Sequence, residues 1–349
     1  MKQLKMQLLT LFLIACFLFT GCSVEIANPA SSDASLSIHY ISVGQGNAVL
    51  AESDGEFMLI DGGERSHSAK VISYLKEQNV ETLDYVITTH YDSDHLSGVV
   101  GAIQNFSVGT LLDPDYETDS KLFSSYVKTK KSLGITSVHP TPGETYRFGA
   151  CDFTILAPNS DYYSDENEYS IAIRLTCGST SFLLTGDASR DSEVEMLASG
   201  LSLESDVFLA GHHGSSTSNS EEFVKAVNPS YAVISVGRDN SYGHPHRETM
   251  ALFSKMDIPV YRTDTQGTII VESDGSELTF NTQPDTQFEE HEASTQDTSL
   301  PFIANKNTCK FHTSDCSGLP KEKNRIYFKT AKEALKEGYE PCRTCKPTD

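Results

Sequence analysis

The stretch His90-Tyr91-Asp92-Ser93-Asp94-His95 places four potential metal ligands within six residues. It directly follows Tyr85-Val86-Ile87-Thr88-Thr89, a run typical of a β-strand. A strand that ends in a short His- and Asp-rich loop puts several ligands on one edge of a sheet. Imidazole nitrogens combined with carboxylate oxygens suit zinc, manganese or iron better than calcium. A solvated polar turn is the alternative, but so dense a cluster favours a metal-dependent hydrolase.

Other strand-like runs end in glycine-containing turns that bear Asp or His. These turns are Asp61-Gly62-Gly63, Thr185-Gly186-Asp187, Gly211-His212-His213-Gly214-Ser215 and Tyr242-Gly243-His244-Pro245-His246. Glycine lets the backbone turn sharply, and loops on a rigid scaffold often bear function. Taken singly, Asp61 or Asp187 is equally consistent with a helix cap, and a lone histidine with a packed or surface residue. Their repetition at strand ends favours one shared site.

The three turns around residues 61, 185 and 211, together with the 90–95 loop, resemble the motifs of the metallo-β-lactamase fold. Val43-Gly44-Gln45-Gly46, the His-His-Gly-Ser run and Tyr242 to His246 make the chain similar to the extracellular hydrolase domain of ComEC-type DNA-uptake proteins. The resemblance covers residues 36–282. It implies an α+β fold, a four-layer αβ/βα sandwich with metals at one edge of its two sheets.

The resemblance also implies a role for each of these side chains. Asp187 would bridge two divalent ions, either zinc or manganese. Asp61 would orient the ligands through hydrogen bonds, a role that metal sites usually need. The first ion would be held by His90 and Asp92, and the second by Asp94, His95 and one of His212 and His213.

Two positions depart from the pattern of that family. The family has a histidine between the first motif and the Thr-Gly-Asp strand, where this chain offers only His139 in a segment that aligns poorly. Asn167 and Ser170 lie nearer the expected place, so the first metal site is expected to be weak, oxygen-rich or empty. The DNA-uptake branch has an aspartate where this chain has Asn47.

The expected chemistry follows from such a pair of ions. A bridged metal pair lowers the pKa of bound water and stabilises the attacking and leaving oxygens of a displacement at phosphorus. Asp94 would help to orient or deprotonate that water, although its role as a ligand limits it as a free base. His244 would donate a proton to the leaving oxygen or bind a phosphate. Alternatively, it only fixes the Gly-His-Pro turn.

A second, small module is predicted after an acidic, polar linker at residues 283–300. His312-x3-Cys316 and Cys342-x2-Cys345 have the spacing of two ligand pairs that close one tetrahedral zinc site. Two disulfides are the alternative, which is plausible in an exported protein. The spacing favours one structural zinc.

Residues 301–349 resemble the metal-binding domain of the Ada DNA-repair protein. His312 replaces the cysteine expected in the first position and Cys309 is an extra thiol, so methyl transfer to a zinc thiolate is not expected. The module has a net charge of +4 within a chain of −21, which leaves −25 for the remainder. DNA affinity depends on cationic contacts. If the substrate is DNA, the expected attractors are Lys321, Lys323, Arg325, Lys329 and Arg343.

The N-terminus is typical of a bacterial lipoprotein signal peptide. Lys2 and Lys5 precede an apolar run from Leu8 to Phe19, and Thr20-Gly21-Cys22 follows. The run is short for a membrane span. We expect a signal peptide at residues 1–22, lipidation of Cys22, with Cys16 as a less favoured candidate, and a tether at 23–35. The protein would then be anchored by lipid to the outer face of the cell membrane.

Cys151 and Cys177 are expected to be small core residues, although a disulfide between them is also possible. Three functions remain open for the whole chain, which we expect to be a monomer. The first is an extracytoplasmic metal-dependent phosphodiesterase or nuclease that acts on DNA. The second is a hydrolase of small esters, such as phosphorylcholine-like groups at the cell envelope. The third is a non-catalytic DNA- or envelope-binding lipoprotein with a degenerate metal site.

Overall fold

The computed structural model describes residues 35–285, 301–305, 310–314, 316–321, 325–336 and 339–347. The predicted signal peptide with Cys22, most of the linker, Cys309 and Lys323 lie outside the described residues. The chain divides into two compact units, Met1–Asp285 and Thr286–Asp349. Each unit is described by itself.

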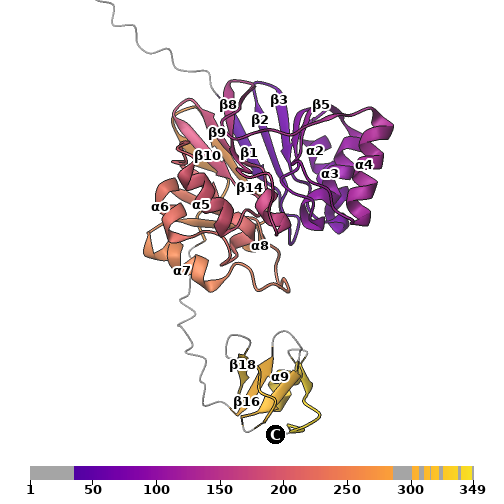
Figure 1. The fold of residues 1–349 in the computed structure, drawn as a ribbon. Helices are drawn as coiled ribbons and strands as arrows, with labels where there is room; N and C mark the ends of the chain where they lie inside the picture. Colours follow the sequence, from indigo (N-terminus) through magenta and orange to yellow (C-terminus); the bar gives the residue numbers. More distant parts are fainter. Residues whose placement is uncertain are drawn as a thin grey trace, which may run out of the picture. The chain divides into compact units, whose positions relative to one another are not determined.

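The first sheet of the larger unit has eight strands. They are β1 (Leu36–Tyr40), β2 (Val49–Ser53), β3 (Glu56–Ile60), β4 (Thr82–Ile87), β5 (Ser107–Leu112), β6 (Ser137–Val138), β14 (Ile269–Ser273) and β15 (Leu278–Phe280). Their order across the sheet is β15-β14-β1-β2-β3-β4-β5-β6 (Figure 1). Strands β3 to β6 run parallel, because α2 (Ser68–Glu77), α3 (Ser93–Asn105) and α4 (Lys121–Leu133) form the crossovers between them.

The second sheet has seven strands. They are β7 (Thr145–Phe148), β8 (Cys151–Ala157), β9 (Ala172–Cys177), β10 (Thr180–Leu184), β11 (Val207–Leu209), β12 (Tyr231–Ile234) and β13 (Val260–Arg262). Their order is β13-β12-β11-β10-β9-β8-β7. Strands β10 to β13 are parallel and are connected through α5 (Arg190–Ala198), α6 (Glu221–Val227) and α7 (Arg247–Lys255).

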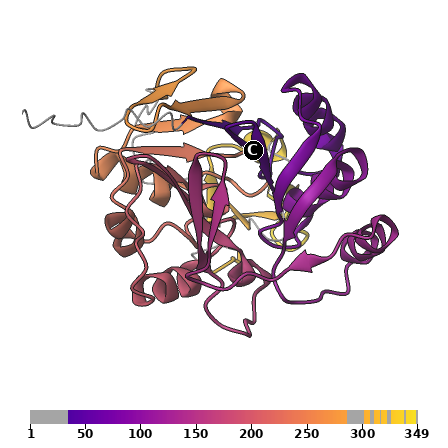
Figure 2. The same ribbon diagram turned by 90° about the horizontal axis from the view of Figure 1, so that it is seen from above.

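Three apolar clusters hold these layers together. The central cluster packs Ile38 and Met58 of the first sheet with Phe153 and Phe182 of the second. One outer cluster joins α2 and α3 to the first sheet, and the other joins α6 and α7 to the second. Figure 2 shows the indigo-to-purple helices and the red-to-orange helices on opposite outer sides. The predicted four-layer αβ/βα sandwich is therefore confirmed.

Parallel strands place their carboxyl ends at a common edge of a sheet, where polar loops can gather. The loop at residues 90–95 follows β4, and the turns at Asp187 and His212 follow β10 and β11. The loop that contains His244 follows β12. The topology therefore brings together the segments that the sequence predicts to hold metal.

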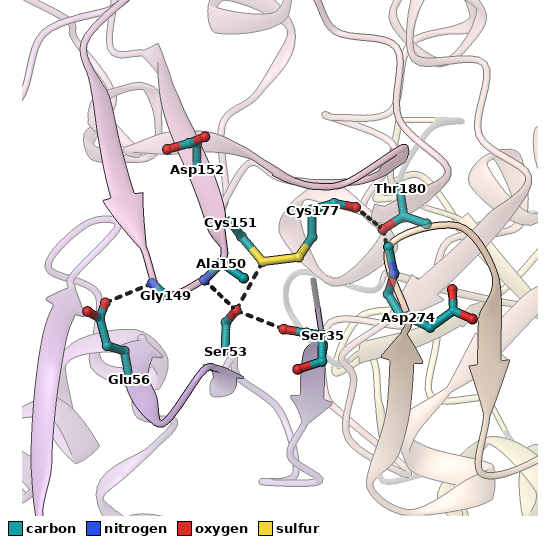
Figure 3. The surroundings of a disulfide bond; sticks show 12 residues. Ser35, Ser53, Glu56, Gly149, Ala150, Cys151, Asp152, Cys177, Thr180 and Asp274 are labelled. Carbon is teal, nitrogen blue, oxygen red and sulfur yellow. Dashed lines mark hydrogen bonds between the residues drawn. A yellow bond between two sulfur atoms is a disulfide. The ribbon is translucent and has the colours of Figure 1, made fainter. Parts of the chain in front are cut away.

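Cys151 on β8 and Cys177 on β9 form a disulfide (Figure 3). Both residues are buried in the central cluster, as the sequence predicts, but their thiols are joined rather than free. They flank a paired position in the antiparallel register of the two strands, which places their Cα atoms 4.4 Å apart. Ser53 of β2 lies beside them and accepts a hydrogen bond from the backbone N–H of Ala150. The first sheet is thus attached to the second at this point.

The smaller unit contains a four-stranded sheet and one helix. The strands are β16 (Phe302–Asn305), β17 (Lys310–Thr313), β18 (Arg325–Phe328) and β19 (Glu340–Pro341), in the order β18-β16-β17-β19. Helix α9 (Ala331–Lys336) contributes Ala331 and Ala334 to a small core with Phe302 and Phe311. Within the described part of the chain, no helix has the length and apolar character that a membrane crossing requires.

Candidate metal centre

Histidine and carboxylate side chains from three loops converge at one edge of the larger unit. His90, His95 and Asp187 bring one ligand atom each within 4.8 Å of one another, and so do Asp94, His95 and His213. Because His95 belongs to both groups, the two clusters are adjacent. Asp187 Oδ1 lies 3.2 Å from His95 Nε2, and its Oδ2 lies 3.5 Å from His213 Nε2. Asp187 therefore faces both clusters, the position expected of a bridging ligand.

Asp92, predicted as a ligand of the first ion, lies near His90 but outside the first cluster, which has His95 in its place. His90 Nε2 lies 3.8 Å from Asp92 Oδ2 and 4.0 Å from Asp187 Oδ2. His90 is fully buried, whereas the Asp92 side chain is half-exposed. His90 and Asp187 therefore form the first cluster with His95, and Asp92 approaches only His90, from the solvent side.

The second cluster contains Asp94, which the sequence pairs with His95. Asp94 Oδ2 lies 3.3 Å from His213 Nε2, which is also 3.3 Å from His95 Nε2. His212 Nε2 is 3.5 Å from Asp187 but is more exposed than its neighbour. His213 thus contacts both carboxylates, and His212 contacts Asp187 from the solvent side.

Three histidine rings are oriented through their Nδ1 atoms. His95 Nδ1–H donates to Asp61 Oδ2 over 2.7 Å, and His213 Nδ1–H donates to the Ser235 carbonyl over 2.9 Å. His90 Nδ1 lies 3.1 Å from Thr89 Oγ1. Each ring therefore directs Nε2 into the centre, the arrangement that metal-bound histidines show.

His90 Nε2 is buried and has no hydrogen-bond partner. Buried polar atoms are almost always hydrogen-bonded, so an orphaned imidazole nitrogen requires an explanation. A metal ion at the convergence point would supply the missing partner. The mixed nitrogen and carboxylate donor set fits zinc or manganese, so the residues present fit the metals that the sequence predicts.

Asp61 is the central residue of the support beneath the ligands. Its carboxylate is fully buried and accepts hydrogen bonds from Thr89 N (2.9 Å), Thr89 Oγ1 (2.8 Å) and Asn47 Nδ2 (3.0 Å), besides His95. An amide at position 47 can donate to Asp61, whereas an ionised carboxylate there would repel it. This hydrogen bond explains why asparagine fits position 47 of this chain, where the related branch has aspartate.

The backbone is in the left-handed region at three residues of the centre. Asp61, His212 and His213 have φ values of 58°, 51° and 54°. Non-glycine residues adopt this conformation at an energetic cost, and such residues cluster at functional sites. Beside Asp61, a Cβ on Gly62 would lie 2.3 Å from Val99 N, so only glycine permits this approach to α3. The loops are thus held in a conformation that local preference alone would not select.

The histidines of the centre differ in the direction of their pKa shifts. Burial and the neighbouring His95 lower the pKa of His90 to about 4. Burial alone would lower the pKa of His213, but Asp187 and Asp94 raise it to about 10. Asp187 is held well below its usual pKa, because His95 and His213 outweigh the effect of burial. Opposite charges are therefore concentrated at the position where Asp187 faces both clusters.

His244 lies beside the second cluster. Its ring centroid is 5.4 Å from that of His212 and 6.2 Å from that of His213. Its Nδ1 lies 3.4 Å from Gln45 Nε2, so the amide donates to Nδ1 and Nε2 carries the ring proton. Burial and then His213 lower the pKa of His244 to about 4. A neutral N–H suits phosphate binding better than proton donation at neutral pH.

The smaller unit holds a second group of candidate ligands. His312, Cys316, Cys342 and Cys345 bring one ligand atom each within 4.8 Å of one another. The three cysteines are free thiols, so the alternative of two disulfides is not realised among them. Backbone N–H groups of residues 345 and 344 donate to Cys342 and lower its pKa to about 7. Sulfur and imidazole donors of this kind are typical of a structural zinc site.

Comparison with known protein families identifies both units. The description "Metallo-beta-lactamase superfamily" belongs to the family whose pattern matches residues 41–238. The chain belongs to this superfamily. The pattern described as "Metal binding domain of Ada" matches residues 291–348. Both resemblances inferred from the sequence are thus confirmed.

Relatives of this metallo-β-lactamase superfamily member include ComE operon protein 3 of Bacillus subtilis, which is 27% identical over 250 residues. The match covers 66% of this chain and 32% of that protein. Competence protein ComA of Neisseria gonorrhoeae is 30% identical over 230 residues, covering 65% of this chain and 30% of that protein. The chain therefore matches about a third of the length of these relatives.

Among solved structures, the metallo-beta-lactamase fold protein YhfI from Bacillus subtilis is similar to this chain with a TM-score of 0.48 and 16% identity. The match covers 69% of this chain and all of that protein.

The histidine that the superfamily has before the Thr-Gly-Asp strand is not supplied by His139. His139 Nδ1 lies 3.1 Å from Asp113 Oδ1, outside the two clusters. Ser170 is fully buried instead, and its Oγ accepts a hydrogen bond from the backbone N–H of Asp187. Asn167 lies in the short 3-10 helix η2 (Glu166–Tyr169). Among these residues, Ser170 therefore supports Asp187 through its hydroxyl.

Two supporting groups, Thr89 and the carbonyl of Ser235, belong to no motif in the sequence. Thr89 is part of the strand-like run before His90, and its hydroxyl links Asp61 to that histidine. The position of Thr89 directly before the ligand loop is the sequence feature that could have indicated its role. The Ser235 carbonyl orients His213 through a backbone contact that no residue type reveals.

Replacing Asp61 with asparagine is expected to weaken metal binding about 10- to 100-fold, the usual effect of losing an outer hydrogen-bond partner. The amide would present N–H donors to a site filled with donors. Isothermal titration with zinc and manganese measures the change. Asp206→Asn is the matched control, because Asp206 accepts from Ser181 N and Oγ away from the centre. Equal affinities in the Asp61 variant and the wild type would show that Asp61 does not position the ligands.

Metal affinity is expected to rise with pH through the neutral range. The pKa of His213 is raised to about 10 in the metal-free chain, so a bound ion must displace its proton. Affinity should increase about tenfold per pH unit for each proton displaced, until the pH approaches that pKa. Calorimetry in buffers of different ionisation enthalpy measures the protons released. Binding that releases no proton at pH 7 would contradict this description of His213.

Proposed function

We propose that this chain is an extracytoplasmic, metal-dependent phosphodiesterase that acts on DNA. The observation that carries the proposal is the convergence of three Nε2 atoms on Asp187 and Asp94, with the buried His90 Nε2 left without a hydrogen-bond partner. Such a donor set is of little use to a purely structural protein, since it concentrates charge and unpaired groups at one edge. It favours the catalytic hypotheses over a non-catalytic binding protein.

The residues of the metal centre would have separate roles in hydrolysis. His90, Asp92 and Asp187 would hold one ion, and His95, Asp94 and His213 would complete the second site with Asp187. When bound, the ions supply Lewis acidity, which lowers the pKa of water and neutralises charge on a phosphoryl group. Asp94, whose pKa is lowered to about 2 chiefly through its hydrogen bond with His213 against the opposing effect of burial, stays ionised and orients water. His244 would donate its Nε2–H to a phosphate oxygen.

DNA is supported as the substrate by two features. Two relatives are named "Competence protein ComA" and "Recombination protein 2", and the second name refers to a process that acts on DNA. The smaller unit presents exposed Lys321, Lys329 and Arg343, and partly exposed Arg325. Cationic contacts to phosphate supply much of the affinity for DNA, and the larger unit is strongly acidic. We therefore assign recruitment of DNA to the smaller unit.

The extracytoplasmic location is supported by the bond between Cys151 and Cys177. Structural disulfides persist in oxidising compartments and are rare in the cytosol. The lipoprotein-like N-terminus, with Cys22 as the proposed lipidation site, agrees with this location. Labelling with a radioactive fatty acid, compared between the wild type and Cys22→Ala, tests the anchor.

Deletion of the smaller unit is expected to impair the hydrolysis of long DNA but not that of small phosphodiesters. A chain that ends at Asp285 should show a raised KM for long DNA, because it lacks the proposed cationic contacts. It should retain turnover of bis-p-nitrophenyl phosphate, which needs only the metal centre. Affinity of the full chain for DNA should also fall steeply as salt rises.

The same comparison decides between the candidate functions. Equal losses on both substrates would mean that the smaller unit only supports the larger one. Brisk turnover of small esters without DNA cleavage under zinc or manganese would favour the envelope-ester hydrolase. No turnover of either substrate would favour the non-catalytic binding protein.

A further inference from the structure

We propose that Tyr242 is a substrate-binding residue that stacks on a nucleobase of single-stranded DNA beside the candidate metal centre. This inference rests on the proposed function and adds to it which part of the substrate is recognised. Tyr242 lies in the loop at residues 237–246, which also holds His244.

Tyr242 is one end of a row of rings that begins at the centre. The residue is 64% exposed, and its ring is stacked on that of His244, with centroids 5.6 Å apart and planes 19° from parallel. His244 in turn meets His212 edge-on at 5.4 Å, and His212 contacts Asp187. The row therefore leads from the solvent to the ligand that faces both clusters.

The position of the tyrosine is fixed by one amide. Asn240 Oδ1 accepts hydrogen bonds from the backbone N–H groups of Tyr242 (3.1 Å) and His244 (3.0 Å). Its Nδ2 donates to the carbonyls of Gly237 (2.9 Å) and His244 (2.6 Å). The two ring-bearing residues are thus held by the same side chain, so an exposed ring sits on an ordered loop.

An ordered, exposed aromatic ring suits a ligand with a flat apolar face. One face of Tyr242 lies against His244, and the exposure of the ring leaves area for a second partner. Stacking on an aromatic side chain strengthens the binding of a single-stranded base by about 5- to 150-fold, and it tolerates any base. Bases inside a duplex are already stacked on their neighbours and do not offer this face. Stacking also needs no net positive charge, and the net charge of the larger unit is strongly negative.

Steady-state kinetics on two oligonucleotides test this proposal. One is an ordinary single strand, and the other is an abasic strand of the same length and charge. Tyr242→Leu should raise KM for the ordinary strand about tenfold or more, since it removes the ring. It should leave kcat and KM for the abasic strand within about twofold of the wild type, because no base is stacked in either case.

Two further variants serve as controls. Tyr242→Phe keeps the ring and should behave as the wild type on both strands. Tyr162→Leu removes a tyrosine that is 80% exposed on a different loop. This variant should leave kcat and KM unchanged for both strands. Equal losses on both strands in Tyr242→Leu would overturn the proposal in favour of a tyrosine that only covers His244. Unchanged KM for the ordinary strand would overturn it as well.

Cleavage of the ordinary strand by the wild-type chain distinguishes a wrong stacking residue from a wrong substrate. If the wild-type chain cleaves the ordinary strand and Tyr242→Leu does so equally well, only the stacking is wrong. If the wild-type chain cleaves neither strand in zinc or manganese, DNA itself is the wrong substrate and both proposals fall.

Discussion

Asp187→Ala is expected to lower kcat/KM for bis-p-nitrophenyl phosphate by about a thousandfold or more. Asp187 is the carboxylate that faces both clusters, with His95 at 3.2 Å and His213 at 3.5 Å. Losing it removes a ligand shared by two ions, and the charge stabilisation that such ions provide amounts to several kcal/mol, each 1.36 kcal/mol being tenfold in rate. Metal content should fall in parallel, which atomic emission spectrometry measures on the purified chain.

The fold of this variant should remain intact, because the substitution leaves the three apolar clusters untouched. Circular dichroism and the thermal midpoint check this point. Asp152→Ala is the matched control, since Asp152 is a half-exposed carboxylate paired with Arg147 on the neighbouring strand. Surface pairs of this kind contribute little to stability. An Asp187 variant that stays fully active would remove the basis for a bridged centre.

Removal of metal is expected to unfold the smaller unit and leave the larger one folded. The four ligands His312, Cys316, Cys342 and Cys345 connect β17, the segment after it and the C-terminal turn. Small modules of this type derive their folding free energy from the metal, with values of about 10–16 kcal/mol for zinc-finger peptides. After chelation, hydrogen exchange in residues 301–347 should approach that of an unfolded chain. Exchange in the core strands of the larger unit should be nearly unchanged.

Cys342→Ser isolates this effect from any loss of metal at the hydrolase centre. The variant should show the same rapid exchange in the smaller unit without a chelator, while turnover of bis-p-nitrophenyl phosphate is preserved. Addition of zinc should restore protection in the chelated wild type but not in the variant. Protection that survives in the metal-free wild type would mean that the small apolar core around Phe311 suffices without an ion.

The sandwich and the identity of the candidate ligands could be predicted because both depend on patterns within short segments of the sequence. A strand that ends in Asp, His or Gly reveals its loop, and parallel strands bring such loops to one edge. The choice between His212 and His213 was not accessible in this way. The two are adjacent in sequence, and only their left-handed backbone decides which ring faces Asp94.

Other features depend on contacts between segments far apart in the chain. The bond between Cys151 and Cys177 follows from the register of β8 and β9, which sequence patterns leave open. The hydrogen bond between Asn47 and Asp61 joins two loops. Asn47, which differs from the aspartate of the related branch, therefore helps to hold the carboxylate that orients His95. The hydroxyl of Ser170 accepts a hydrogen bond from the backbone N–H of Asp187, a contact between residues 17 positions apart. Each of these requires the tertiary structure.

The metal content of a chain in which Cys342 and Cys345 are both replaced with serine tests directly whether the larger unit binds metal. With the smaller unit unable to close its site, any tightly bound ion belongs to the larger one. We predict at least one zinc or manganese ion per chain, with turnover of bis-p-nitrophenyl phosphate, and loss of both when His90 and His95 are also replaced with alanine. A chain that retains no ion after reconstitution, or one whose turnover is unaffected by the two histidine substitutions, would contradict the assignment of this centre.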